Sequence, residues 1–176
     1  MRILRRMVWK IVIRKTAEMK TENFFEEVKS VMLYIEEVSA RLGQPITATD
    51  YYIENLGCPH RKPKNLPKGY GAVYMFAFNG EWLKIGKVNS KSQARFTSQH
   101  YSFNAMSTLS KSLAADKKMQ EYGICRETSR AWVEQNTYRI NILVKAEIGI
   151  AATELIEAML HYKFRPRYEG KTIQNT

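Results

Sequence analysis

A chain of 176 residues with 44% hydrophobic residues can fold around one well-formed core but is too short for two domains of ordinary size. Its formal charge of +11 and pI near 9.7 predict an anionic partner, nucleic acid ahead of an anionic membrane, because a basic surface gains free energy by releasing counterions from a polyanion. Cys58 and Cys125 lie far apart and form no paired motif, which argues against a disulfide framework and a four-ligand zinc site and fits a reducing cytoplasm.

The first 20 residues form a basic arm. They carry seven Lys and Arg against one Glu, which is more than half of the net charge. The charges interrupt every apolar run before it reaches the length of a signal peptide, and no later segment is long enough to cross a bilayer, so we expect a cytoplasmic protein without membrane contact. The arm is either a solvated surface helix or a segment that grips phosphates.

Residues 22–42 predict an amphipathic helix. Apolar residues from Phe24 to Leu42 recur at helical spacing, acidic residues occupy the first turn, and Gly43 follows the end. After it, Thr49 or Asp50 can cap a short second helix that stops at residue 57.

Residues 58–69, CPHRKPKNLPKG, are basic and rich in proline, and they predict a loop. The loop is either a linker or a contact with nucleic acid through Arg61, Lys62 and Lys64. A zinc site at Cys58 and His60 would need two further ligands at motif spacing, which the sequence lacks.

The segment GAVYMFAFNGEWLKIGKV, residues 71–88, predicts a β-hairpin, because two β-rich runs flank an Asn-Gly dipeptide. A two-residue turn would pair Tyr74 with Ile85 and send Lys84 to the opposite face of the sheet. For Tyr74 and Lys84 to share one site, we therefore predict a three-residue loop, 78–80, with a bulge that pairs these two residues.

Three further segments complete the expected fold. A helix is expected from residue 89 or 90 to about residue 100, followed by a polar insert with helical segments at 104–135. The alternation in YRINILV predicts a half-buried strand at 138–144, and an apolar face predicts a last helix at 151–164. The expected fold is α+β: a small antiparallel three-stranded sheet flanked by helices within residues 70–170, with an N-terminal helical extension over residues 1–69.

The order of these elements resembles the GIY-YIG nuclease superfamily. The first signature triplet reads Ala72-Val73-Tyr74 and the second Lys84-Ile85-Gly86. Lysine in place of the second tyrosine is similar to the GIY-YIG type II restriction enzymes, in which a lysine follows the first tyrosine by ten residues and an arginine comes eleven residues later. Lys84 and Arg95 follow Tyr74 at this spacing.

The C-terminal helix supplies a second match. The run EAMLHYKFRPRY, residues 157–168, resembles the glutamate helix of the nuclease domain in the bacterial excision-repair nuclease subunit, where the metal-binding glutamate precedes R-P-R-Y by the spacing of Glu157. The asparagine that usually follows in those proteins is Glu169 here, so the role of that asparagine is not carried over. The resemblance covers residues 70–100 and 138–169.

The resemblance implies metal-dependent hydrolysis of DNA phosphodiesters. Tyr74 would be the general base, for which Lys84 and Lys87 on the facing strand would have to favour the phenolate. Arg95 would donate to the phosphate oxygens, and Glu157, or Glu154 one turn earlier, would hold one Mg²⁺ or Mn²⁺. Taken singly, each residue is typical of a solvated surface or an ordinary strand aromatic; only their joint spacing indicates a site.

The implied role is restriction or another defence function, with a homodimer expected for an enzyme that cuts palindromic DNA. Two alternatives stay open: a catalytically weak nucleic-acid-binding module with the same fold and charge, and a nuclease of repair or mobile elements. His100 either contacts DNA or packs inside the protein.

Overall fold

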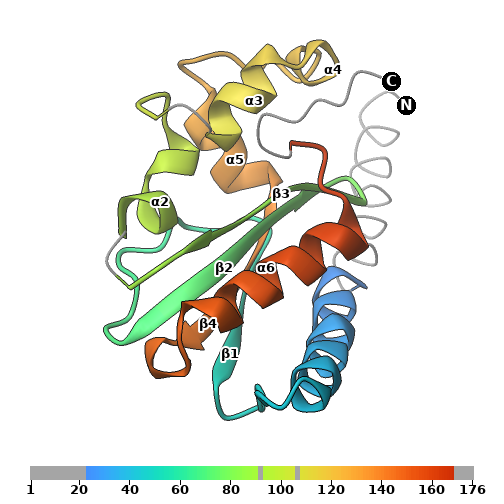
Figure 1. Cartoon of the computed structure of the whole chain (residues 1–176). Coiled ribbons are helices and arrows are strands. Elements are labelled where there is room, and N and C mark those ends of the chain that lie inside the picture. Colours follow the sequence, from blue (N-terminus) through green and yellow to red (C-terminus); the bar gives the residue numbers. More distant parts are fainter. Residues whose placement is uncertain (1–22, 91–92, 106–107, 169–176) are drawn as a thin grey trace, which may run out of the picture.

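The computed structural model describes residues 23–90, 93–105 and 108–168, and these form an α+β fold around a four-stranded antiparallel sheet (Figure 1). The strand order is β1-β4-β2-β3. The strands are β1 (Tyr51–Gly57), β2 (Tyr70–Phe78), β3 (Glu81–Val88) and β4 (Tyr138–Lys145). The predicted α+β class and the positions of the three expected strands are confirmed, but the prediction of a three-stranded sheet is wrong because a fourth strand, β1, pairs with β4. The basic arm lies outside the described residues.

The fourth strand, β1, occupies the segment for which a short helix was predicted, so that prediction is wrong. Its first three residues, Tyr51 to Ile53, are aromatic or β-branched and favour a strand. They pair with residues 142–144 of β4, far away in the sequence. The possible caps Thr49 and Asp50 instead belong to a turn, in which the Asp50 carboxylate accepts from the Thr47 amide at 2.8 Å.

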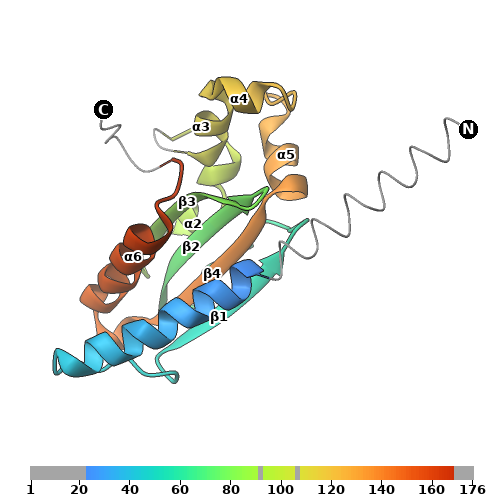
Figure 2. The ribbon, with the colours of Figure 1, turned by 90° about the vertical axis from the view of Figure 1, so that its right-hand side faces the viewer.

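Helices cover both faces of the sheet (Figure 2). The helix over residues 23–41 and α6 (Ile150–Phe164) lie side by side on one face. The other face carries the shorter helices α2 (Gln93–Thr97), α3 (Leu109–Ala115), α4 (Lys117–Gln120) and α5 (Ser129–Asn136), with a 3₁₀ turn at Gln99–Tyr101. The last helix and the helical insert are confirmed, whereas the helix expected up to residue 100 divides into α2 and the 3₁₀ turn.

The N-terminal extension contributes to the same core as the rest of the chain. Phe24, Val28 and Ile35 of the helix over 23–41 pack with Val73 of β2 and Ile156 of α6 in one buried cluster. β1 extends the sheet on which this helix lies. The boundary expected near residue 70 therefore does not divide the hydrophobic core.

β4 is buried on both of its faces. The alternating pattern predicted a strand buried on one face only, so that prediction is wrong. Ile140 and Ile142 face the cluster under α6, while Arg139 and Asn141 are fully buried on the opposite face. The helices of the insert cover that second face, and a pattern within β4 cannot reveal them.

The hairpin between β2 and β3 turns at Asn79 and Gly80. Both residues have positive φ angles, 50° and 81°, as a two-residue hairpin turn requires, and Phe78 pairs with Glu81 across them. The predicted three-residue loop is therefore wrong.

A bulge at Leu83 resets the register just beyond the turn. Phe76 pairs with Lys84, and Tyr74 pairs with Gly86, so the predicted pairing of Tyr74 with Lys84 is also wrong. The extra residue nevertheless places Lys84 on the face that carries Tyr74, which is the outcome for which the longer loop was predicted.

No helix in the described parts of the chain has the length and apolar character needed to cross a bilayer.

Candidate active site at the edge strand

Tyr74 extends from β2 across the edge strand β3. Tyr74 is 1% exposed, and its ring packs at a tilt of 50° against the ring of His100, with the two ring centroids 4.5 Å apart. The phenol passes so close to Gly86 that a Cβ on this residue would collide with it. The last residue of the Lys84-Ile85-Gly86 triplet is therefore glycine for a steric reason, the close approach of Tyr74.

The charge environment of Tyr74 differs from the expectation. Burial raises the pKa of Tyr74 above its ordinary value, and the nearby Arg95 and Arg139, which lower it, do not offset burial. The cations that favour the phenolate are thus two arginines and not Lys84 and Lys87. In this structure Tyr74 is a protonated hydroxyl at neutral pH.

Lys84 is buried on the same face as Tyr74. Its ammonium donates to the Tyr168 carbonyl at 3.2 Å. Burial and the neighbouring charge of Arg95 lower the pKa of Lys84. Arg95 itself lies on α2 with an exposed side chain, close enough to act on both Tyr74 and Lys84.

Lys87 points to the other face of β3, where it meets α6. Its Nζ lies 2.6 Å from Oε2 of Glu157 and 3.6 Å from Oε1 of Glu154, and the hydrogen bond with Glu157 raises the pKa of Lys87. The Glu157 side chain is 20% exposed against 53% for Glu154, and Glu157 is the one of the two whose charge acts on Tyr74. These differences favour Glu157 over Glu154 as the functional carboxylate.

Four residues from four elements thus lie close enough for their charges to interact near β3: Tyr74 on β2, Lys84 on β3, Arg95 on α2 and Glu157 on α6. Lys87 joins this group through Glu157.

The donor set at α6 is compatible with one hard divalent cation. Glu157 and Glu154 both present carboxylate oxygens near the Lys87 ammonium, and Mg²⁺ prefers one or two carboxylates together with several waters. The ion would compete with Lys87 for Glu157. Across residues 23–90, 93–105 and 108–168, no group of three His, Cys, Asp or Glu could hold a metal.

The sequence did not indicate a role for Arg139, which is fully buried on the face of the sheet that α2, α3, α4 and α5 cover. Its guanidinium donates to the Tyr101 hydroxyl at 2.6 Å, to the Phe96 carbonyl at 2.9 Å and to Asn141 Oδ1 at 2.9 Å. Because Phe96 follows Arg95, these bonds fix the part of α2 that carries Arg95. A polar residue inside a strand flanked on both sides by helical segments is the one signal that could have found it.

His60 anchors the proline-rich loop by hydrogen bonds to Thr137 and to Tyr101, the tyrosine that also binds Arg139. Its Nε2 lies 2.9 Å from the Tyr101 hydroxyl and its Nδ1 lies 2.8 Å from the Thr137 carbonyl. Because Thr137 offers a carbonyl, Nδ1 is the protonated nitrogen, and Nε2 accepts from Tyr101. Both ring nitrogens are thus engaged without a metal, and burial lowers the pKa of His60 to about 4.

The remaining candidates for a contact with nucleic acid differ in exposure. Arg61 and Lys64 are exposed and Lys62 is half-buried, so the loop presents its charges to solvent. His100 is buried, its Nδ1 accepts from the Leu109 amide at 3.3 Å, and its ring packs on Tyr74. The structure therefore favours packing for His100.

The R-P-R-Y run after α6 lies along β3. The amides of Arg167 and Tyr168 donate to the carbonyls of Trp82 and Leu83 at 2.9 and 2.8 Å. This pairing brings the Tyr168 carbonyl to the ammonium of Lys84.

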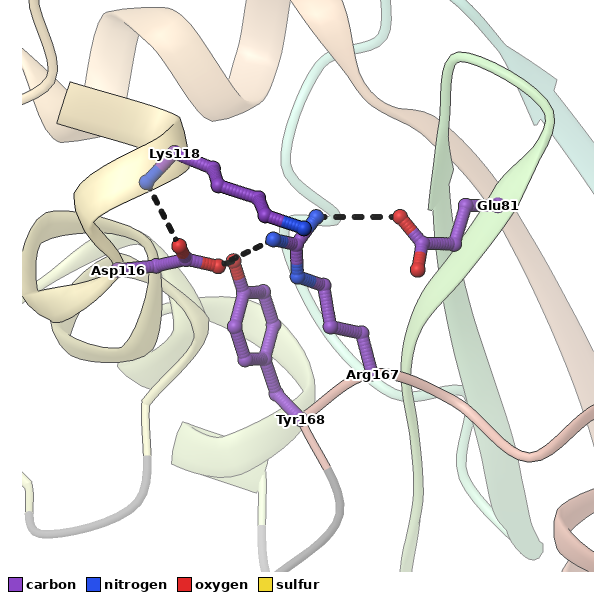
Figure 3. A network of polar contacts seen from close by, with 5 residues as sticks. All are labelled: Glu81, Asp116, Lys118, Arg167 and Tyr168. Atoms are coloured by element: carbon purple, nitrogen blue, oxygen red, sulfur yellow. Dashed lines mark hydrogen bonds and ion pairs between the residues drawn. The ribbon is translucent and has the colours of Figure 1, made fainter. Parts of the chain in front are cut away.

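Side chains of the same run connect β3 with the helical insert (Figure 3). Arg167 bridges Glu81 at 3.1 Å and Asp116 at 2.8 Å, and the Tyr168 hydroxyl donates to Asp116 at 2.8 Å. In this structure Arg167 and Tyr168 therefore have a structural role in fixing the β3 side of the site.

The fold and the site together define an α+β protein with a cluster of cations, one tyrosine and one glutamate around its edge strand. Comparison with protein-family models, with curated proteins and with solved structures finds no match for this chain.

Proposed function

We propose that the protein is a divalent-metal-dependent endonuclease that hydrolyses DNA phosphodiester bonds and that it is related to the GIY-YIG nucleases. The observation that supports this most directly is the convergence of Tyr74, Lys84, Arg95 and Glu157 around β3, because motif spacing in the sequence independently selects the same four residues. The net charge of +11 supports DNA as the partner.

Three of the four residues have a defined chemical task in this proposal. Arg95 donates its planar fork of N–H groups to the phosphate oxygens as negative charge develops on them. Glu157 holds Mg²⁺ or Mn²⁺, which when bound would stabilise the leaving 3′ oxygen. Tyr74 is the general base in this proposal: it must first lose its own proton, which Arg95 and Arg139 favour and burial opposes, before the phenolate can take a proton from the attacking water.

A binding module without turnover is the second candidate. The buried, protonated Tyr74 and the close ion pair between Lys87 and Glu157 favour it, because both oppose the charges that hydrolysis needs. If the protein is an endonuclease, we propose a role in restriction or another defence function, with a homodimer acting on palindromic DNA. We prefer this role to repair or mobile-element cleavage.

The test compares cleavage with binding for Glu157→Gln and Glu154→Gln. The two glutamates lie one turn apart and contact the same lysine, so they form a matched pair. We expect the wild-type chain to cut plasmid with Mg²⁺ or Mn²⁺ and not with EDTA. Glu157→Gln should retain DNA binding and lose at least ~100-fold in cleavage, while Glu154→Gln stays near wild type.

Loss of cleavage in Glu154→Gln alone would move the metal to that residue. A wild-type chain that binds DNA but never cuts it, with either ion, would leave the binding module as the function.

A further inference from the structure

A cavity of about 280 Å³ opens between the end of β3, α2 and the start of α6. Val88, Ala146 and Ile150 supply apolar surface, and the basic residues Lys87 and Arg95 also line it. The volume lies just below the ~300–1,000 Å³ typical of sites for drug-sized ligands, so a smaller occupant fits.

The first turn of α6 faces this cavity without a side-chain cap. Gly149 precedes the helix at a φ of 87° and offers no side chain to the first amides. The N–H groups at the start of a helix have no acceptor within the helix, and they form the positive end of its dipole. This 15-residue helix therefore presents unpaired donors at the cavity.

Thr153, at the end of that first turn, adds a hydroxyl from a largely buried residue. It is 6% exposed and lines the cavity, yet within the described chain no residue hydrogen-bonds to its hydroxyl. Gly71 lies opposite: a Cβ there would be 3.5 Å from Thr153 Oγ1 and 3.1 Å from the Val88 carbonyl. The missing side chain of Gly71 keeps this part of the cavity open.

We propose that the cavity binds a phosphate group. The unpaired amides at the start of α6, the Thr153 hydroxyl and the Arg95 guanidinium are all donors, and together they match an acceptor with several oxygens and a negative charge. The carboxylates on the same helix, Glu154 and Glu157, are engaged by Lys87, which limits their repulsion of an anion.

The inference rests on the proposed function in one respect, the source of the phosphate. Thr153 and Glu157 are four residues apart, ~6 Å along the helix axis, which falls between one and two nucleotide steps of ~3.4 Å along a DNA strand. A phosphate in the cavity would therefore belong to a nucleotide next to the cleaved bond. A free nucleotide or inorganic phosphate carries the same group.

The test titrates inorganic phosphate and deoxyadenosine 5′-monophosphate into the full chain by calorimetry, with EDTA present. The variants Ala151→Glu and Ala158→Glu change the net charge equally on exposed positions of α6, but residue 151 lies in the first turn and residue 158 does not. We expect Ala151→Glu to weaken binding at least ten-fold and Ala158→Glu to leave it within two-fold. Helix stability cannot explain that loss, because an acidic residue stabilises the first turn of a helix.

A second pair of variants tests the hydroxyl. Thr153→Val should weaken phosphate binding about five-fold, and Thr153→Ser should restore it. No binding to the wild type, or equal binding to Ala151→Glu and Ala158→Glu, would overturn the proposal.

Competition with a short single-stranded oligonucleotide identifies the source. If inorganic phosphate displaces the bound oligonucleotide from the wild type and Ala151→Glu weakens this displacement, the cavity binds a DNA phosphate. If the mononucleotide binds and the oligonucleotide does not compete with it, the cavity binds a free nucleotide. Neither readout requires cleavage, so failure of the nuclease proposal and failure of the phosphate site are separate results.

Discussion

At the scale of single residues, the contact between Tyr74 and Gly86 gives the sharpest steric prediction. Gly86→Ala introduces a Cβ that collides with the phenol, so either the ring or β3 must move. We expect a loss of ~1–3 kcal/mol in the free energy of unfolding, measured by urea denaturation, together with loss of any cleavage that depends on Tyr74.

The control for that prediction is a double-mutant cycle. In a Tyr74→Ala background the ring is absent, and Gly86→Ala should cost well under half of its cost in the wild type. Equal costs in the two backgrounds would mean that the collision with Tyr74 is not the cause.

The two buried histidines predict a loss of stability in mild acid. Burial lowers the pKa of His60 from 6.5 to about 4 and the pKa of His100 well below 6.5, so the folded chain keeps both neutral while the unfolded chain protonates them. The unfolded state therefore binds more protons below pH 6.5. As the pH falls from 6.5 towards 4, each histidine lowers the free energy of unfolding by up to ~1.4 kcal/mol per pH unit.

Urea denaturation of the wild type and His60→Gln at about pH 7 and about pH 5 measures this effect. At about pH 7 the wild type should have a larger free energy of unfolding than His60→Gln. This difference should shrink at about pH 5, because only the wild type carries a histidine with a lowered pKa at residue 60. An advantage that does not change with pH would contradict a neutral His60.

At the scale of elements, Arg139 connects β4 with α2, a helix of five residues that cannot be stable by itself. Arg139→Met leaves the Phe96 carbonyl and Asn141 Oδ1 without their donor, and we expect a cost of at least ~2 kcal/mol. We also expect faster hydrogen exchange of the amides of residues 93–101. Arg139→Lys should do nearly the same, because one ammonium cannot replace the three-way fork.

Arg130→Met on α5 is the matched control for Arg139→Met. Arg130 is exposed and pairs with Glu134 at 3.6 Å, so its loss should change stability by less than ~0.5 kcal/mol. Unchanged exchange over residues 93–101 in Arg139→Met would show that other contacts hold α2 in place.

The elements that the sequence predicts are those with a local signal. The Asn-Gly turn, the alternation in β4 and the helical spacing around 23–41 and α6 each depend on neighbouring residues. β1 depends instead on pairing with β4 far along the chain, and the bulge at Leu83 depends on which core Trp82 and Leu83 enter. Neither has a local pattern.

The candidate site also combines features that the sequence predicts with features that depend on distant contacts. The motif spacing selects Tyr74, Lys84, Arg95 and Glu157, and the structure brings them together. Spacing cannot show that Tyr74 is buried, because its burial comes from His100 and from the glycine on the next strand. Arg139 belongs to no motif, and its role follows only from the helices that close over β4.

At the scale of the whole molecule, charge is distributed unevenly along the chain. The first 20 residues hold a net +6 of the total +11, and they precede a helix whose first residues include Glu26 and Glu27. The cations that the structure describes around β3, Lys84, Lys87 and Arg95, lie on β3 and α2. Binding strength and cleavage chemistry are therefore expected to depend on different parts of the chain.

Deleting residues 1–20 tests that separation, since it lowers the net charge from +11 to +5 and leaves the described residues intact. We expect weaker DNA binding and a flatter dependence of log affinity on log salt, by ~0.9 for each phosphate contact that is lost. At saturating DNA the cleavage rate should stay within about two-fold, because the residues around β3 remain. A full-length chain with the seven Lys and Arg of the arm changed to Gln controls for chain length and should show the same slope as the deletion. A salt slope equal to that of the wild type in both proteins would mean that the arm does not contribute to DNA binding, and the phosphate contacts would then have to come from residues 21–176.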